Sequence, residues 1–336
     1  MSKNKFIHHI GVDLLGSETK EKDFFSSLLF LTEERKDIFF IVFGTKNLLK
    51  IFDKDLYENI SFFLVEEVIT MEDSPLRAIK QKKKSSLCEG INLLRDKKID
   101  AFVSCGNTGA LMTYAKLQLP MLPFISRPAL LALLPTKKHP LAVIDVGANV
   151  TASFRILFEF ALLGIAFQKN RGISQPLLGL LNIGEEAQKG TLEMKKAYDY
   201  FTMMEKQLVN IFHFQGNIEG KKVFQGNIDV LITDGFTGNI FLKTSEGLAN
   251  LVLDKLQENI PTKDLSSFQF ILDDLKKCLH YEKYPGALLC GVEGIIVKCH
   301  NYSSSSAFLS GIKGAIHFCE NNLISFMKKF LEKAKF

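Results

Sequence analysis

The sequence predicts an α/β protein, with a three-layer α/β/α arrangement around a mostly parallel, doubly wound sheet. Short apolar runs alternate with longer segments of helical spacing along the 336 residues. Near-continuous apolar runs are typical of strands covered on both faces, and parallel strands need crossover connections, which are usually helices. No linker rich in proline, glycine or serine divides the chain, so we expect one continuous domain over residues 1–336.

The elements follow from these two patterns. The strand candidates are Phe6–Asp13, Ile38–Gly44, Ile60–Val65, Asp100–Ser104, Leu130–Leu134, Leu141–Asp145, Leu177–Asn182 and Asp229–Thr233. Helical spacing predicts helices over Ser74–Arg95, Ala152–Gln168, Glu185–Lys206, Asn239–Gln257 and Ser306–Lys333.

A further helical segment, Asp264–Tyr281, follows Pro261 without a clear strand before it. Residues from about 240 to 282 are therefore expected to form a projecting helical pair. We interpret its apolar face as core or subunit packing in preference to membrane contact, because amphipathic helices usually face another protein surface.

Two strand ends carry nearly the same sequence. One strand starts at Asp100 and the other at Asp229, and each is followed by a hydroxyl residue and a Gly-x-Thr-Gly turn that opens a helix. Glycine permits the tight turn, and the N–H groups of a helix start attract an anion. A third strand end of this kind precedes Asn149. Turn geometry alone is the alternative, but the polar residues favour a phosphate-type site: Asn107, Thr108, Asp234, Thr237 and Asn239.

Basic residues and one histidine add further candidates. Arg77, Lys80 and Lys84 recur on one face of the predicted helix over 74–95, where they would hold a phosphate or an acidic carrier protein, unless the face is simply solvated. Arg127 precedes an apolar run and suits bidentate phosphate binding, with a loop salt bridge as the alternative. His300 follows a strand end beside Lys298, although an isolated histidine is more often structural.

Composition and the absence of known motifs exclude several classes of protein and of binding site. The net charge of +5 fits an anionic substrate or acidic partner and falls short of a nucleic-acid signature. No G-x-G-x-x-G or P-loop sequence follows a strand, and no G-x-S-x-G elbow or metal-ligand cluster occurs. The six cysteines have no C-x-x-C spacing, which predicts free thiols in a reducing compartment. With no signal peptide and no apolar run long enough to span a bilayer, we expect a cytoplasmic protein.

Five motifs occur in order along the chain: Ser104–Leu111, Arg127–Leu130, Asp145–Asn149, Leu180–Glu186 and Asp234–Asn239. Together they resemble the bacterial phosphate acyltransferase family, the acyl-[acyl-carrier-protein]:phosphate acyltransferases of phospholipid synthesis. The resemblance runs from Gly11-Val12-Asp13 to the final helix. The chain departs from the family in the segments Asp13–Glu18, Tyr284–Leu288 and Lys298–Ser303, where glycines are lost and the acid and the histidine are kept.

The resemblance implies a fold like phosphate acetyltransferases and isocitrate- or isopropylmalate-type dehydrogenases, and a homodimer. It implies a long-chain acyl-carrier-protein thioester as donor, inorganic phosphate as acceptor, and neither a metal nor a redox cofactor. The acyl phosphate would pass to a membrane acyl-phosphate:glycerol-3-phosphate acyltransferase, which allows a peripheral position at the inner face of the membrane.

The reaction is expected to be direct attack of a phosphate oxygen on the thioester carbonyl, with no enzyme nucleophile. The expected catalytic residues are Asp234, His300, Lys298 and Asn107. The expected phosphate-binding residues are Gly106, Thr108, Gly109, Arg127, Asn149, Gly235, Thr237, Gly238 and Asn239. Arg77, Lys80 and Lys84 are expected to dock the carrier protein. The alternatives are a phosphate acetyltransferase using a short acyl-coenzyme A, a decarboxylating dehydrogenase, and a non-enzymatic carrier-protein or membrane scaffold.

Overall fold

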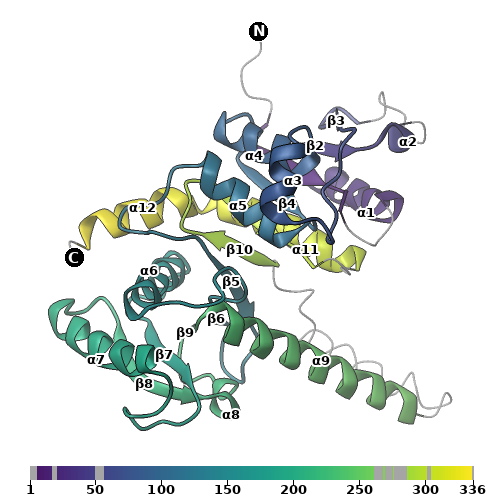
Figure 1. Cartoon of the computed structure of the whole chain (residues 1–336). Coiled ribbons are helices and arrows are strands. Elements are labelled where there is room, and N and C mark those ends of the chain that lie inside the picture. The colour runs from purple at the N-terminus through teal and green to yellow at the C-terminus, as the bar shows by residue number, and fades with distance from the viewer. Residues whose placement is uncertain are drawn as a thin grey trace. The chain divides into compact units, whose positions relative to one another are not determined.

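The computed structural model describes residues 6–16, 21–49, 57–260, 268, 275, 286–300 and 304–334. The chain divides into two compact units (Figure 1). Unit 1 comprises Met1–Leu130 and Pro285–Phe336, and unit 2 comprises Leu131–Tyr284. Each unit is compact in itself, and the single domain expected over residues 1–336 stays a prediction.

The sheet of unit 1 has the order β3-β2-β1-β4-β11-β10. Only the β10–β11 pair is antiparallel, so the carboxyl ends of the other neighbouring strands meet at one edge. In that register Asp13 lies opposite Ser104, and Ser104 lies opposite Lys298. The strands are β1 (His8–Asp13), β2 (Ile38–Gly44), β3 (Ile60–Leu64), β4 (Ala101–Ser104), β10 (Ala287–Cys290) and β11 (Ile295–Lys298).

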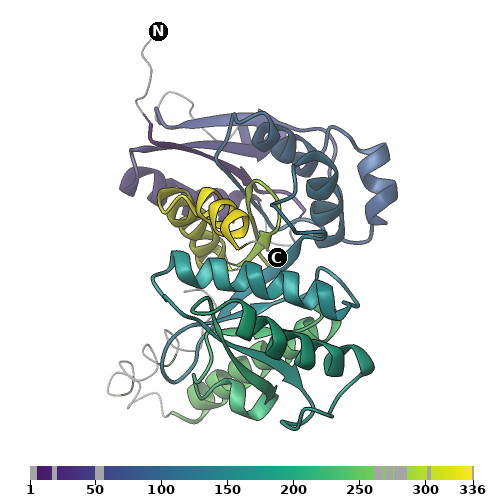
Figure 2. The same ribbon diagram turned by 90° about the vertical axis from the view of Figure 1, so that its left-hand side faces the viewer.

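Helices cover both faces of this sheet (Figure 2). A Cβ on Gly90 of α4 would lie 2.1 Å from the ring of Phe102, whereas one on Gly311 of α11 would meet Val103 and Cys299. Because Phe102 and Val103 are neighbours on one strand, α4 and α11 lie on opposite faces. The helices of unit 1 are α1 (Glu21–Glu34), α2 (Lys46–Leu49), α3 (Pro75–Gln81), α4 (Ser86–Arg95), α5 (Thr108–Gln118), α11 (Ser305–Glu320) and α12 (Leu323–Lys333).

Unit 2 has the order β5-β6-β9-β7-β8, with an antiparallel β5–β6 pair and parallel pairing elsewhere. The strands are β5 (Ala129–Leu134, whose first two residues belong to unit 1), β6 (Leu141–Ile144), β7 (Leu177–Asn182), β8 (His213–Glu219) and β9 (Val230–Ile232). The helices are α6 (Phe154–Asn170), α7 (Leu192–Gln207), α8 (Gly220–Val223) and α9 (Gly235–Asn259). α6 buries 11 of its 17 residues, ten of them apolar or glycine, as expected for a helix packed on a sheet.

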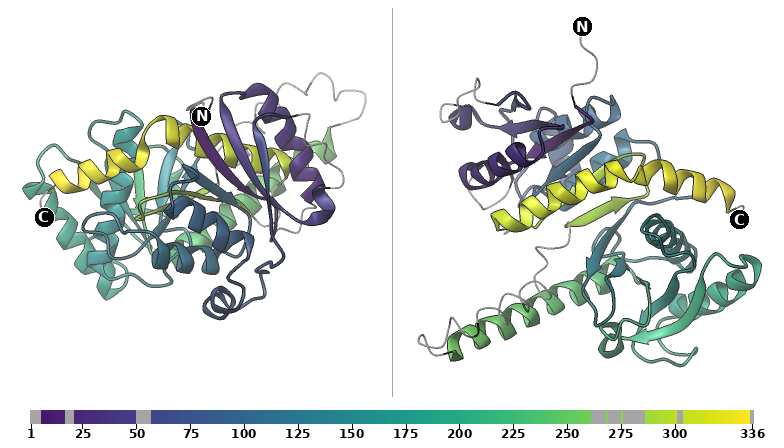
Figure 3. Two further views of the ribbon diagram at one scale, coloured as in Figure 1. Left: turned by 90° about the horizontal axis from the view of Figure 1, so that it is seen from above. Right: turned by 180° about the vertical axis from the view of Figure 1, so that it is seen from behind.

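α9 begins directly after β9 and extends away from the rest of unit 2 (Figure 3). Its buried residues are only Gly235, Gly238, Leu242 and Leu253, so most of its length lacks intramolecular packing within the described residues. The helix predicted over Asn239–Gln257 is confirmed, and the projecting pair stays a prediction. The second helix, expected up to residue 282, lies outside the described residues apart from the isolated positions 268 and 275.

Two predicted helices are interrupted. The segment over 74–95 breaks into α3 and α4 because Ser85 adopts an extended conformation and accepts a hydrogen bond from the Cys88 amide as the cap of a new helix. The prediction that Arg77, Lys80 and Lys84 share one helical face is therefore wrong, since Lys84 lies in the intervening turn. The segment over 306–333 breaks at Asn322, whose φ of 50° is left-handed.

Candidate active site

The glycine turn of unit 1 is tied to a buried carboxyl group on the neighbouring strand. The Ser104 hydroxyl donates to Asp13 Oδ2 at 2.7 Å and accepts from the Gly106 amide at 3.0 Å. Burial raises the pKa of Asp13 to about 6, against the opposing effect of its hydrogen bonds. The sequence motifs contained Asp13 and Ser104 without assigning either a role, because the pairing of β1 with β4 joins residues far apart in the chain.

Asn107 fixes the start of α5. Its Oδ1 accepts from the Ala110 amide at 3.0 Å, and its Nδ2 donates to the carbonyls of Thr70, Met71 and Asp73 at 3.0, 3.3 and 3.1 Å. The side chain thus caps the helix and holds the preceding loop. The first N–H groups of a helix have no acceptor within it, so Thr108 and Gly109 offer amides at this helix end. Asn107 as a catalytic residue stays a prediction.

Lys298 lies beside the same turn. Its ammonium is buried and donates to the carbonyl oxygen of Cys105 at 3.2 Å and to that of Cys299. Since Ser104 and Lys298 are register partners, this positive charge sits directly next to Gly106. His300, two residues further on, is exposed. Unit 1 therefore brings Lys298 together with Gly106 and Asn107.

The glycine turn of unit 2 is held by close backbone contacts. Asp234 caps α9, accepting from the Thr237 amide at 2.7 Å through Oδ1, and the Gly235 amide donates to the Asn149 carbonyl at 2.7 Å. A Cβ on Gly238 would lie 1.9 Å from the Asp145 carbonyl oxygen, so this position requires glycine. Turn geometry therefore accounts for this glycine, as the alternative interpretation expected.

The other predicted binding residues of unit 2 gather at this turn. Thr237 and Asn239 are exposed on the first turn of α9, and the Asn239 side chain lies beside Gly147. Asn149 donates through Nδ2 to Asp145 at 2.9 Å. One part of the predicted site thus forms in each unit, and their union into a single phosphate site stays a prediction.

The predicted basic residues of unit 1 differ in their surroundings. Arg77 and Lys80 are exposed on α3, and Arg127 is exposed before β5. Lys82 is instead bound to Asp73 at 2.5 Å, and its position beside that carboxylate lowers the pKa of Asp73. Arg77 and Lys80 therefore remain the exposed basic side chains of α3 that a partner would meet.

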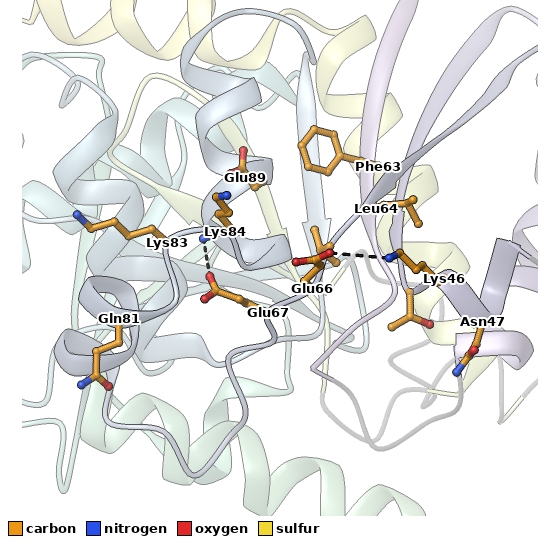
Figure 4. Close-up of a pocket in the computed structure, with 12 residues that line it drawn as sticks. Lys46, Asn47, Phe63, Leu64, Glu66, Glu67, Gln81, Lys83, Lys84 and Glu89 are labelled. Carbon is orange, nitrogen blue, oxygen red and sulfur yellow. Dashed lines mark hydrogen bonds and ion pairs between the residues drawn. The ribbon is translucent and has the colours of Figure 1, made fainter.

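An open hollow of about 1010 Å³ lies at the carboxyl ends of β2 and β3 (Figure 4). Lys84 and Lys83 line it, and the Lys84 amide donates to Glu67 Oε2 at 2.8 Å. The charges of its lining residues balance, because three lysines (Lys46, Lys83 and Lys84) and three glutamates (Glu66, Glu67 and Glu89) line it. This balance makes the hollow a poorer anion site than the Gly106 turn with its buried ammonium.

Solved structures with the same fold include two phosphotransacetylases. The phosphotransacetylase of Streptococcus pyogenes superimposes with a TM-score of 0.61 at 15% identity, covering 93% of this chain and 94% of its own. The EutD phosphotransacetylase of Staphylococcus aureus gives a TM-score of 0.57 at 14% identity, with 92% and 94% covered. The chain thus has the mostly parallel α/β fold of this class, as predicted.

Sequence comparison defines the family. The chain belongs to the family described as "Fatty acid synthesis protein", whose pattern matches residues 8–326. A phosphate acyltransferase of Clostridium tetani is 37% identical over 339 residues, covering 96% of this chain and 97% of the relative. One of Staphylococcus epidermidis is 38% identical over 330 residues, with 95% and 98% covered. The predicted resemblance is confirmed.

Proposed function

We propose that this protein transfers a long-chain acyl group from an acyl-carrier-protein thioester to inorganic phosphate, giving acyl phosphate for phospholipid synthesis. The observation that carries this proposal is the match, over nearly the whole chain, to relatives that are named phosphate acyltransferase. The description of the family as a fatty acid synthesis protein supports a fatty acyl group.

The reaction needs little covalent chemistry from the protein. A phosphate oxygen attacks the thioester carbonyl, the new C–O bond forms as the C–S bond breaks, and the electron pair leaves with the thiolate. The protein must bind phosphate, hold the thioester against it, and stabilise the oxyanion. No side chain has to become acylated.

The turn of unit 1 supports the phosphate role best. The amides of Thr108 and Gly109 lie at the positive end of α5, and the Lys298 ammonium adds a fixed charge beside Gly106. Arg127 is an exposed guanidinium of the kind that binds phosphate through two hydrogen bonds. We assign the turn of unit 2, with Thr237 and Asn239, to hydrogen bonds with phosphate or with the oxyanion. Asp234 would orient a donor, and His300 would protonate the leaving thiolate.

The carrier protein is assigned to the basic residues Arg77 and Lys80, with Lys84 nearby. Acyl carrier proteins are strongly acidic, so opposite charge would steer the encounter. The homodimer, the downstream membrane acyltransferase and a peripheral position at the membrane rest on the family resemblance. Within the part of the chain that the structure describes, no helix is both long and apolar enough to cross a bilayer.

The test measures thiol release from a long-chain acyl carrier protein with and without inorganic phosphate. We expect release that saturates with phosphate and yields acyl phosphate. Release at an equal rate without phosphate would mean a thioesterase. Faster turnover of a short acyl-coenzyme A would favour the phosphate acetyltransferase alternative, and carrier binding without release would favour a scaffold.

A further inference from the structure

Asp145, at the end of β6, is the centre of a hydrogen-bonded loop. Its side chain is fully buried. Oδ1 accepts from the amides of Gly147 and Ala148 at 3.1 and 2.8 Å. Oδ2 accepts from the amide of Asn149 at 2.7 Å and from its Nδ2 at 2.9 Å. Three successive backbone amides and one side-chain amide therefore converge on one carboxyl group.

Successive backbone N–H groups that point into one concavity form a nest, which is an anion-binding arrangement. In the nest of residues 147–149 the anion is the chain's own carboxylate. Hydrogen bonds to a carboxylate are charge-assisted, so the four donors fix the loop more firmly than neutral pairs would. The nest is thereby occupied, which leaves it no role as the site of a phosphate.

The same carboxyl group abuts the first turn of α9. A Cβ on Gly235 would lie 2.9 Å from Asp145 Oδ2 and 2.7 Å from the Asn149 carbonyl oxygen, which accepts the Gly235 amide. Gly238 lies against the Asp145 carbonyl. The backbone of residue 145, the nest and the helix start are therefore packed without space for even one methyl group.

Unit 1 repeats the arrangement, which argues against chance packing. Asp13 ends β1 and lies opposite Ser104, as Asp145 follows β6 and donates its backbone amide to the carbonyl of Thr233, the residue after β9. In each unit a buried acid on one parallel strand supports the Gly-x-Thr-Gly turn that follows the neighbouring strand.

We propose that Asp145 is a positioning residue for the acyl transfer: its carboxylate holds the nest of residues 147–149 and, through Asn149 and Gly235, sets the first turn of α9, which presents Thr237 and Asn239 to phosphate. Asp145 itself touches no substrate. This inference rests on the proposed function, in which the turn of unit 2 contributes to the phosphate site.

Asp145→Asn is the main test. The variant keeps the volume but replaces one acceptor oxygen with an NH₂ group, which then faces N–H donors in either orientation. We expect the KM for phosphate to rise at least about tenfold, because small displacements of binding groups are costly. The KM for the acyl carrier protein should change less than about twofold. In hydrogen exchange the amides of residues 147–149 and 235 should exchange faster.

Asp229→Asn is the matched control. Asp229 is also a buried carboxyl group of unit 2 and accepts from the Leu177 amide at 2.8 Å, but it precedes β9, at the opposite end from the turn. We expect this variant to lower stability while the KM for phosphate and the exchange at 147–149 stay at the wild-type values. Equal effects of the two variants would reduce the role of Asp145 to general stability and overturn the inference.

A second variant covers the case in which Asp145→Asn does not fold. Asn149→Ala keeps the carboxylate and removes the Nδ2 hydrogen bond to it, so we expect a smaller rise in the same KM. An unchanged KM for phosphate in the folded variant would overturn the positioning role, while phosphate-dependent turnover by the wild type would leave the proposed function standing. If the wild type itself shows no dependence on phosphate, the proposed function fails first.

Discussion

At the scale of single residues, Asp13 makes the stability of the protein depend on pH. Its folded-state pKa of about 6 exceeds the ordinary value of 3.8, so the folded state holds a proton that the unfolded state has lost between these values. The contribution of this group to the free energy of unfolding therefore falls as pH rises from about 4 to about 6, by roughly 3 kcal/mol.

Asp13→Asn should remove this decrease in the free energy of unfolding. Urea unfolding of the variant and the wild type at several pH values gives the difference in unfolding free energy between them. We expect this difference to shift in favour of the variant as pH rises from about 4 to about 6 and to level off above. A difference that is independent of pH would show that Asp13 does not titrate in this range.

Removing the two helix caps, Asn107 and Asp234, should lower the stability of the protein by different amounts. Asn107 is buried and holds three carbonyls besides the Ala110 amide, whereas Asp234 is only partly buried and caps through the Thr237 amide. We expect Asn107→Ala to lower stability by about 1–3 kcal/mol more than Asp234→Ala does, because it removes three hydrogen bonds to backbone carbonyls besides the cap itself. Thermal unfolding measures both losses of stability.

Both variants should also lose about tenfold or more in turnover. Full activity of both variants would show that the turns are purely structural.

At the scale of elements, α3 is the helix expected to meet the carrier protein. Charge reversal in Arg77→Glu/Lys80→Glu should raise the KM for acyl carrier protein several-fold at low salt, since opposite charges attract over about 10 Å at 0.1 M ionic strength. The KM for phosphate should not change. The control Lys329→Glu/Lys333→Glu makes the same charge change on exposed positions of α12. Equal shifts for both pairs would trace the effect to net charge.

The accuracy of the element predictions follows the hydrophobic pattern. Ile38–Gly44 and Leu177–Asn182 are predicted to the residue, because strands buried on both faces are apolar throughout. β8 (His213–Glu219) is not predicted, because most of its residues are polar or partly exposed and its apolar residues follow no regular period. The break at Ser85 follows from its capping hydrogen bond, which a helical spacing of apolar residues does not reveal.

At the scale of the whole molecule, the sequence repeat corresponds to a structural one. The repeated Gly-x-Thr-Gly turns predict two helix starts, and the structure places one in each unit, on α5 and on α9. The acids behind them were not given a role from sequence, because the partnership of Asp13 with Ser104, or of Asp145 with Thr233, depends on which strands become neighbours. Strand order is a long-range property that local patterns do not contain.

The cysteines, predicted as free thiols, have a practical consequence for assaying the reaction. Cys88, Cys105, Cys290, Cys299 and Cys319 are buried and form no disulfide, and burial raises the pKa of Cys319 to about 12 and that of Cys105 well above its usual range. Only a thiolate reacts readily with a disulfide reagent. Among the described residues, then, the enzyme contributes little colour with such a reagent, and the signal reports the thiol released from the carrier. These five cysteines therefore need no blocking when the phosphate dependence of turnover is followed continuously in native protein; Cys278 lies outside the described residues.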